Sequence, residues 1–446
     1  MTKSLRTQLI ELGPEQLADA LLELSDRYPA VAEIIEGLLA TPDENIERYK
    51  AKLADLKHCE DFVSWQELDD FAFELQQLLN DLERGVKDPC TGVDLLAQFF
   101  EIDKVIVHRC DDSGGSATDL FLSSATDLFV SFASQCNNKQ VIADRVIKLN
   151  EDNDYDLRDN LFERAGEYLP EAILRTMIDE LWIRASQSDN AYKAGRWLKA
   201  IQGLAKQLQD APLFEKARLE HLRPTDVPWF DIARVYLECG DPQTALIKLQ
   251  LIPDDTESFR SHERQLLLLA VYRELGDTEA QTKILWQLFN AHHSQSTLTQ
   301  LLDCIGHDQR EVVVNETIKK IVLDPQLSYN DAEFLLEEQR LDELERYLKQ
   351  RFDKINGESY YWLLPIAEGL EAGGKLLMSS LIYRSLTDSI LARAKSKYYH
   401  HGVNYLKKLD QLAPRVTDWQ SWITHDTYRA NLQKNHKHKT AFWSKY

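Results

Sequence analysis

The sequence predicts an all-α protein: a helical-repeat, tetratricopeptide-like solenoid preceded by an N-terminal helical bundle. Hydrophobic residues recur at helical spacing along most of the 446 residues. Glycine and proline are scarce, at 17 and 13 residues, whereas sheet-rich folds need more turn residues. A turn motif also recurs in the second half at the period of helical repeats. We therefore expect helices to hold more than about 60% of the chain.

Composition and charge exclude several classes of protein. The chain is 43% hydrophobic and 28% charged, which is enough apolar material for a core. Its 52 basic and 73 acidic residues give a net charge of −21, which argues against general binding of nucleic acid or anionic membranes. The longest purely apolar run is Leu266–Tyr272, far short of a membrane span. We expect no membrane association.

The first region, residues 1–88, is predicted to be helical. Pro14 suits the first turn of a helix, and the segment Thr41–Glu44 is a typical helix start. Ser64 and Glu67 have the spacing of a capping box, which predicts a long helix that continues to Leu82.

The second region, residues 89–222, is predicted to be a helical bundle. Helical periodicity covers residues 92–110, 117–135, 139–149, 170–186 and 191–209. Small and acidic residues predict loops at 111–116 and 150–160. The second loop has carboxylates at EF-hand spacing, but Leu157 stands where that motif needs glycine, so we interpret it as a solvated linker.

The third region, residues 223–390, is predicted to consist of tetratricopeptide-like repeats. The segment Val235–Asp241 recurs 36 residues later as Val271–Asp277. Weaker turns follow, which places the series at 240, 276, 306, 340 and 374. Glycine would take the left-handed position that ends one helix, and the following aspartate would cap the next. Gly369–Lys375 matches part of a phosphate-binding loop, but Leu376 replaces the required Ser or Thr, so we assign this segment to a turn.

The cysteines indicate a reducing environment. They lie at 59, 90, 110, 136, 239 and 304, and no Cys-x-x-Cys pair occurs. We interpret all six as buried thiols. Because the N-terminus also lacks the apolar segment of a secretory signal, we expect a cytoplasmic protein. No metal-ligand spacing, cofactor motif or catalytic signature is present, so we predict no cofactor and no metal.

Aromatic side chains on the first helices of the repeats are candidate contacts for a partner. In stacked helix pairs the first helices usually line the concave surface. We expect some of the aromatic residues there to flank an exposed groove: Trp229, Tyr236, Tyr272, Tyr361 and Trp362.

The last region, residues 391–446, carries the opposite charge from the rest of the chain. It contains eleven Lys and Arg residues and only three Asp. Such asymmetry indicates an interaction surface, and two interpretations stay open. The segment could dock on its own acidic body as a cap, or it could bind nucleic acid or phosphate.

The same region resembles a known family. The segment Ala394–His401 contains His400 and His401, and a spaced motif follows: His425, Tyr428, Leu432, His436, Lys439, Phe442 and Trp443. This pattern resembles the C-terminal signature of an uncharacterised bacterial all-helical family, a domain of unknown function similar to proteins that carry SWIM zinc fingers. The resemblance implies a cytoplasmic, tetratricopeptide-like protein without assigned activity. The Cys-x-Cys and Cys-x-His elements of the SWIM motif are absent, so a zinc-dependent role is not implied.

The motif also predicts its own packing. Its positions advance by three or four residues and so share one helical face. We expect Tyr428, Leu432, His436, Phe442 and Trp443 to pack against the helix that contains Tyr398–Leu409. His400 or His401 should meet that contact through a hydrogen bond. At least one of Lys434, Lys437 and Lys439 should stay solvated.

Three hypotheses for function follow. The first is a non-enzymatic scaffold that binds a protein or peptide partner through the solenoid groove. The second is an accessory subunit that binds nucleic acid or phosphate through residues 391–446 alone. The third is an enzyme with a site between the N-terminal helices and the solenoid, which no motif supports.

Overall fold

A computed structural model shows a helical chain. It describes residues 4–59, 61–220, 222, 227–252 and 261–446. Helices make up 77% of the structure, which confirms the predicted all-α class. Among the described residues the sole β pairing is an isolated bridge between Val63 and Cys110. The chain divides into two compact units, Met1–Ile252 and Pro253–Tyr446. This boundary falls inside the range 223–390 that the sequence analysis treats as one repeat region.

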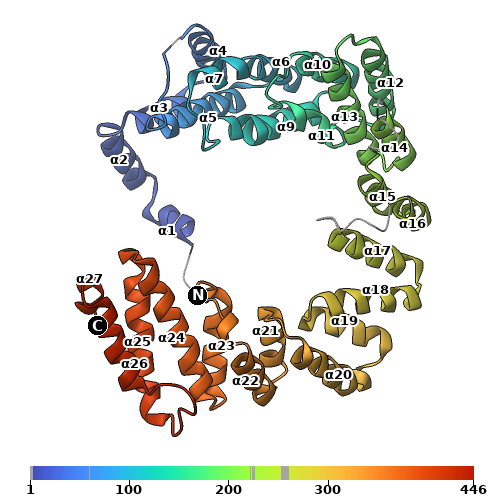
Figure 1. Cartoon of the computed structure of the whole chain (residues 1–446). Helices are drawn as coiled ribbons and strands as arrows, with labels where there is room; N and C mark the ends of the chain where they lie inside the picture. Colours follow the sequence, from blue (N-terminus) through green and yellow to red (C-terminus); the bar gives the residue numbers. More distant parts are fainter. Residues whose placement is uncertain (1–3, 60, 221, 223–226, 253–260) are drawn as a thin grey trace. The chain divides into compact units, whose positions relative to one another are not determined.

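The first unit contains helices α1 to α16 (Figure 1). Their bounds are α1 Leu5–Leu12, α2 Pro14–Ser25, α3 Pro29–Leu39, α4 Pro42–His58, α5 Leu68–Gly85, α6 Pro89–Phe100, α7 Asp103–Arg109, α8 Thr118–Leu120, α9 Thr126–Gln135, α10 Lys139–Glu151, α11 Asp159–Glu163, α12 Glu171–Gln187, α13 Ala191–Gln207, α14 Ala211–Leu219, α15 Trp229–Glu238 and α16 Pro242–Gln250. A π-helical turn, Phe121–Ala125, joins α8 to α9.

The second unit contains helices α17 to α27. Their bounds are α17 Ser261–Leu275, α18 Thr278–Ala291, α19 Gln295–Ile305, α20 Arg310–Leu323, α21 Tyr329–Glu337, α22 Leu341–Gln350, α23 Tyr360–Ala372, α24 Leu376–Arg393, α25 Tyr399–Leu412, α26 His425–His436 and α27 Thr440–Trp443. In Figure 1 the helices α23, α24 and α25 lie side by side, and each packs against the next.

Of two helix starts predicted from the sequence, the one at Thr41 is present and the one at Ser64 is displaced. Thr41 and Glu44 form a complete capping box at the start of α4. Ser64 donates a hydrogen bond to Glu67 through its hydroxyl, at 2.7 Å, but the helix begins only at Leu68. Glu67 also accepts a hydrogen bond from the Ser64 amide at 3.2 Å, so this half of the predicted capping box is present. The other half is wrong, because the Glu67 amide donates to the Ser64 carbonyl instead of the Ser64 hydroxyl.

The predicted turns of the second half are present. At Gly240 and Gly276 the backbone is left-handed, with φ of 80° and 70°. The next residues, Asp241 and Asp277, each accept the amide of the third residue along at 2.9 Å, as the capping argument predicts. These turns join α15 to α16 and α17 to α18, and the two helices of each pair pack together.

The later turns differ in whether a glycine takes the left-handed conformation. Gly374 is left-handed, with φ of 77°, between α23 and α24. At the turn near 340 the left-handed residue is Gln339, which bears a side chain. Gly306 leads into a short 3₁₀ turn before α20. A turn that the sequence analysis missed joins α13 to α14, with Gln209 left-handed and Asp210 as the cap.

A buried ion pair organises the loop that was predicted to be a solvated linker. Arg158 is buried and holds the buried Asp103 through two hydrogen bonds, of 2.8 Å and 2.6 Å. Its guanidinium also donates to the Leu149 carbonyl at 2.6 Å. Because a buried arginine needs several partners, this loop is a packed part of the first unit. The interpretation as a solvated linker is wrong at Arg158.

The cysteines differ from the prediction. Cys90 and Cys136 form a disulfide across 46 residues. The two halves meet because α6 packs against α9, and Cys136 immediately follows α9. Of the other four, Cys110 is buried and the rest are partly exposed. The expectation of six buried thiols is therefore wrong, because helix packing joins two cysteines that are far apart in sequence.

Candidate functional site

The five predicted groove residues have very different exposure. Tyr361 is 74% exposed at the start of α23, whereas Tyr236 is buried. The remaining three, Trp229, Tyr272 and Trp362, are partly buried. Trp229 and Tyr236 belong to the first unit, and the others belong to the second. The structure therefore separates these candidates, and only Tyr361 is freely accessible.

Trp229 and Tyr236 take part in a closed network of their own unit. The Lys248 ammonium lies 5.6 Å from the centroid of each ring. Glu215 accepts a hydrogen bond from the Tyr236 hydroxyl at 2.7 Å and one from Lys248 at 2.6 Å. Burial, followed by the Glu215 carboxylate, raises the pKa of Tyr236, so the phenol remains a neutral donor. These two aromatic residues connect α14, α15 and α16 instead of facing an open groove.

The C-terminal motif packs largely as its spacing predicts. Tyr428, Leu432 and Phe442 are buried. The Phe442 ring meets Tyr399 of α25 edge to face, with centroids 5.7 Å apart. Gly402 permits this approach, because a Cβ there would lie only 3.1 Å from the Phe442 ring. The last helices therefore dock on α24 and α25.

Polar contacts fix the same segment. Lys439 donates to the Leu391 carbonyl at 2.6 Å, and the Trp443 indole donates to the His436 carbonyl at 2.9 Å. Burial, followed by the neighbouring Lys439 cation, lowers the pKa of His436. Lys434 and Lys437 are exposed, in line with the expectation that some of the lysines stay solvated.

The predicted role of the adjacent histidines is wrong. His400 and His401 are both exposed, and their ring centroids lie 3.9 Å apart. The buried histidine is His425, whose Nε2 lies 2.7 Å from Asp410 Oδ1. Tyr399, one residue earlier than His400, faces the docked segment instead, because on this helix position 399 turns inward and positions 400 and 401 turn outward.

Arg384 of α24 is the most unusual buried group near the motif. It is 5% exposed, and its guanidinium lies 4.3 Å from the ring centroid of Trp419 and 4.7 Å from that of Tyr428. One nitrogen donates to the Ile423 carbonyl at 2.9 Å, whereas Nε and one Nη have no partner among the described residues. Burial lowers its pKa to about 10. Arg384 therefore holds the segment 419–428 by lying over the rings of Trp419 and Tyr428.

A pocket of about 170 Å³ opens beside this region, and we call it the aromatic pocket. Its walls come from α24, from α25 with the turn before it, and from the segment that enters α23. The lining residues are Gly357, Tyr360, Leu386, Ile390, Arg393, Tyr398, His401 and Tyr405. Gly357 is required here, because a Cβ would lie 2.1 Å from the Ser385 carbonyl oxygen of α24. The pocket thus combines an apolar floor with an aromatic and cationic rim.

The sequence predicts only one wall of this pocket. His401 was a candidate, and Tyr361 and Trp362 lie next to Tyr360 in α23. Tyr360, 60% exposed, was missed. The signal for it was the uninterrupted aromatic run 360–362, and the signal for Tyr398 and Tyr405 was their spacing of seven residues on one helical face.

The basic residues of 391–446 are mostly engaged within the second unit. Arg393, Lys408, Arg415 and Arg429 each lie within 4 Å of a carboxylate. Lys397 lies over the ring of Tyr398, with its ammonium 4.8 Å from the centroid. The segment is therefore a docked cap whose cations are partly compensated. The described residues contain no group of His, Cys, Asp and Glu that could hold a metal ion.

One protein-family profile covers almost the whole chain. The profile of a family of unknown function (DUF6880) matches residues 2–218 and 220–445. The chain belongs to this family. A search of curated proteins finds no match. Among the helices of this DUF6880 member that the structure describes, none is both long and apolar enough to cross a membrane.

Proposed function

We propose that this DUF6880 protein is a non-enzymatic, cytoplasmic scaffold with tetratricopeptide-like repeats that binds a segment of a partner protein. The observation that carries the proposal is the aromatic pocket. Partner sites in proteins concentrate binding energy in a few aromatic and cationic anchors around a well-formed pocket. Here Tyr360, Tyr398 and Arg393 surround a floor of Leu386 and Ile390.

The size of the pocket selects the ligand group. A cavity of about 150 Å³ lined by apolar side chains is large enough to hold benzene. The aromatic pocket has about 170 Å³ and opens to solvent at exposed Tyr360. It therefore fits one leucine- or phenylalanine-sized side chain, presented by a peptide that lies across the exposed Tyr361.

The charge of the rim favours a carboxylate next to that side chain. Arg393 lines the opening, and the Lys397 ammonium lies over the ring of Tyr398, which also lines it. Among the described residues, Arg393 pairs with the Glu358 carboxylate at 3.7 Å. A hydrogen bond and the nearby charge of Lys397 lower the pKa of Tyr398, which is a sign of excess positive potential. The expected partner segment carries an apolar anchor flanked by Asp, Glu or a chain-terminal carboxylate.

The alternative function, nucleic-acid or phosphate binding through residues 391–446, has weaker support. Four of its cations already pair with carboxylates of the same unit. The net charge of −21 also repels a long polyanion.

The test uses the full chain with methyl-labelled isoleucine and leucine. Phenylacetate, an aryl group with a carboxylate, should shift the methyl signals of Leu386 and Ile390, and phenethylamine should bind about tenfold more weakly. Tyr360→Ala should weaken phenylacetate binding, and Arg393→Gln should remove the discrimination between the two probes. Tyr192→Ala, at a 59% exposed tyrosine of α13, is the matched control and should change neither result.

Selection of short random peptides on the same protein extends the test to protein partners. Enriched peptides should share an apolar anchor next to an acidic group and should lose about tenfold in affinity with Tyr360→Ala. If the probes leave Leu386 and Ile390 unshifted, or if the selected peptides bind Tyr360→Ala as well as they bind the natural protein, the proposal is wrong.

A further inference from the structure

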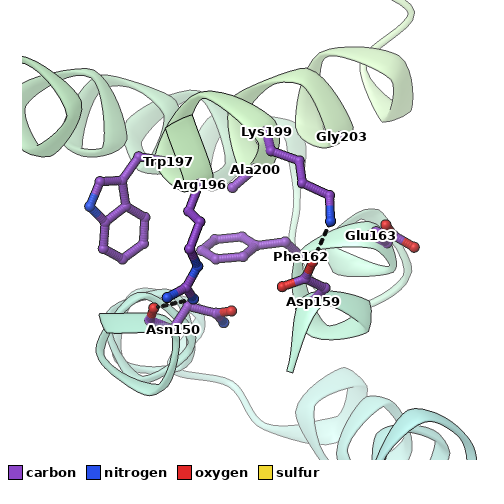
Figure 2. A pocket seen from close by; sticks show the side chains of 9 residues that line it. All are labelled: Asn150, Asp159, Phe162, Glu163, Arg196, Trp197, Lys199, Ala200 and Gly203. Carbon is purple, nitrogen blue, oxygen red and sulfur yellow. Dashed lines mark hydrogen bonds and ion pairs between the residues drawn. The ribbon is translucent and has the colours of Figure 1, made fainter. Parts of the chain in front are cut away.

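A second hollow, in the first unit, differs in character from the aromatic pocket. It begins as a small cleft of about 40 Å³ between α13 and the end of α10 with α11 (Figure 2). From α13, Arg196 donates to the Asn150 carbonyl at 2.9 Å, and Lys199 pairs with Asp159 at 2.7 Å. Figure 2 shows the ring of Phe162 between these two contacts, with Gly203 one turn beyond Lys199. The cleft itself has room for little more than a water molecule.

The cleft continues into a larger groove of about 590 Å³, and we call the two together the α13 groove. The larger part shares Glu163, Lys199 and Gly203 with the cleft and is otherwise bounded by α13, α14 and α15. Its remaining lining residues are Gln202, Lys206, Gln207, Phe214, Arg218, Asp231, Arg234 and Val235. All of them belong to the first unit.

The charge of the α13 groove is reversed relative to the chain. Five cations line it, against the three carboxylates Asp159, Glu163 and Asp231, whereas the whole chain has 52 basic and 73 acidic residues. Two of the cations form ion pairs, Lys199 with Asp159 and Arg218 with Asp231. The groove therefore offers positive charge in a strongly acidic protein.

Two of the cations lie on aromatic faces at the groove. The Lys206 ammonium is 5.3 Å from the ring centroid of Phe214, and the Arg234 guanidinium is 4.8 Å from that of Phe230. The buried Nε of Arg218 has no hydrogen-bond partner among the described residues. Ring faces orient a cation without neutralising its charge, so Lys206 and Arg234 remain available to an anionic ligand.

Gly203 indicates where a ligand chain would lie. Glycine inside a helix costs about 1 kcal/mol relative to alanine, so an interior glycine usually makes room for a close neighbour. Apart from the neighbouring residues and backbone of its own helix, no atom of the described residues lies within 4 Å of the position that a Cβ of Gly203 would take. The same is true of Gly195 on the same helix, which does not line the groove. The space over Gly203 is bounded by the groove cations and open to a ligand.

We propose that the α13 groove binds an acidic segment of a partner protein. The backbone of the segment passes over Gly203, and its carboxylates meet Lys206, Arg218 and Arg234. A short acidic peptide suits the groove better than a nucleic acid does, because the cations are confined to one groove of limited volume and the surrounding protein repels an extended polyanion. This site is independent of the aromatic pocket, and its ligand is defined by charge.

The test measures the affinity of a fluorescein-labelled oligoglutamate peptide for the full chain by fluorescence anisotropy. Gly203→Leu fills the groove without a Cβ contact to any other element among the described residues, and Lys206→Glu with Arg234→Glu reverses the charge of the groove. Each change should weaken binding at least about tenfold, and binding to the natural protein should fall as salt is raised. Melting temperatures establish that the variants are folded.

Matched controls decide the outcome. Gly195→Leu adds the same side chain to the same helix outside the groove, and Lys148→Glu reverses an exposed cation of α10. Both should bind oligoglutamate as the natural protein does.

If Gly195→Leu weakens binding as much as Gly203→Leu, or if neither does, the proposal is overturned. It is also overturned if short oligothymidylate displaces the peptide at equal charge and binds more tightly, because the groove would then be a nucleic-acid site. Tyr360→Ala should leave oligoglutamate binding unchanged, which separates this proposal from the aromatic pocket.

Discussion

The hydroxyl of Tyr428 donates a hydrogen bond to Asp388 Oδ1 at 2.7 Å, which joins α26 to α24. Tyr428 is buried, whereas Asp388 lies at the exposed edge of this contact. Desolvation of the two polar groups at the contact raises the pKa of the Asp388 carboxyl and the pKa of the Tyr428 phenol. The Tyr428 hydroxyl also lies 3.3 Å from the Arg384 carbonyl oxygen. One phenol therefore serves two acceptors of α24 and holds the C-terminal segment in place.

Tyr428→Phe should lower the free energy of unfolding by about 1–3 kcal/mol, because it removes the hydrogen bond from the buried Tyr428 hydroxyl to the Asp388 carboxyl group. Urea denaturation of the full chain measures this change. Tyr360→Phe removes the same hydroxyl at a 60% exposed position and should change the stability by less than about 0.5 kcal/mol. Equal stability of the two variants would contradict the structural role of Tyr428.

The cap itself gives a second prediction. Phe442→Ala should cost about 3–5 kcal/mol, because it leaves a cavity between Tyr399 and Gly402. Phe62→Ala, at a 64% exposed phenylalanine, is the control with the same change of side chain and should cost far less. Deletion of residues 424–446 should destabilise the protein by several kcal/mol and expose apolar surface that binds a hydrophobic dye. If the truncated chain has the same melting temperature as the full chain, the segment does not act as a cap.

Sequence patterns predicted the local geometry well, because local geometry depends on neighbouring residues. The Gly-Asp turns at 240 and 276 follow from the left-handed preference of glycine and the capping chemistry of aspartate. The turn at 209 was missed because Gln209 occupies the left-handed position without being glycine. Helical spacing likewise placed Tyr428 and Leu432 on one buried face.

Contacts between segments that are far apart in the chain could not be predicted from the sequence. The spacing of His400 and His401 does not fix which side of α25 faces the core, and Tyr399 took the position expected of a histidine. The aromatic pocket joins Tyr360 to Tyr398 and Tyr405 through helix packing. The ion pair of Arg158 with Asp103 spans 55 residues, so no local pattern indicates it.

The pH dependence of stability should report on His436. Its pKa is lowered by burial and by the Lys439 cation, while Asp388 acts in the opposite direction. A histidine whose pKa is lower in the folded protein binds protons better when unfolded, so its contribution to stability is present above its ordinary pKa of about 6.5 and is lost as the pH falls below that value. His436→Gln should therefore reduce the loss of melting temperature between about pH 8 and about pH 5.

An exposed neighbour provides the comparison for this measurement. His438→Gln makes the same substitution at an exposed histidine of the same segment, and the contribution of His436 is read as the difference between the pH profiles of the two variants. A profile for His436→Gln that coincides with that of the natural protein would show that His436 titrates equally in the folded and unfolded chains.

The disulfide gives the last prediction. Cys90 and Cys136 enclose a separation of 46 residues, and closing a loop of that length in the unfolded chain is worth about 4 kcal/mol in the chain-entropy treatment. Treatment of the oxidised protein with a reductant should therefore lower its melting temperature, and Cys90→Ala should abolish that sensitivity. Cys304→Ala, at a partly exposed thiol of the second unit, should retain it. Peptide mapping without reduction should recover residues 90 and 136 in one linked fragment.

The same experiment tests where the protein works. A disulfide of this kind persists in oxidising surroundings and is rare in the reducing cytoplasm, where the sequence analysis placed the chain. If the linked fragment is recovered from cells lysed under alkylating conditions, the cytoplasmic expectation is wrong. If Cys90 and Cys136 are alkylated there as free thiols and the bond forms only on later oxidation, the packing of α6 against α9 still brings the two sulfurs together, with a Cα–Cα distance of 5.2 Å. The pair would then stabilise the first unit only after oxidation, and the reductant should leave the melting temperature of freshly isolated protein unchanged.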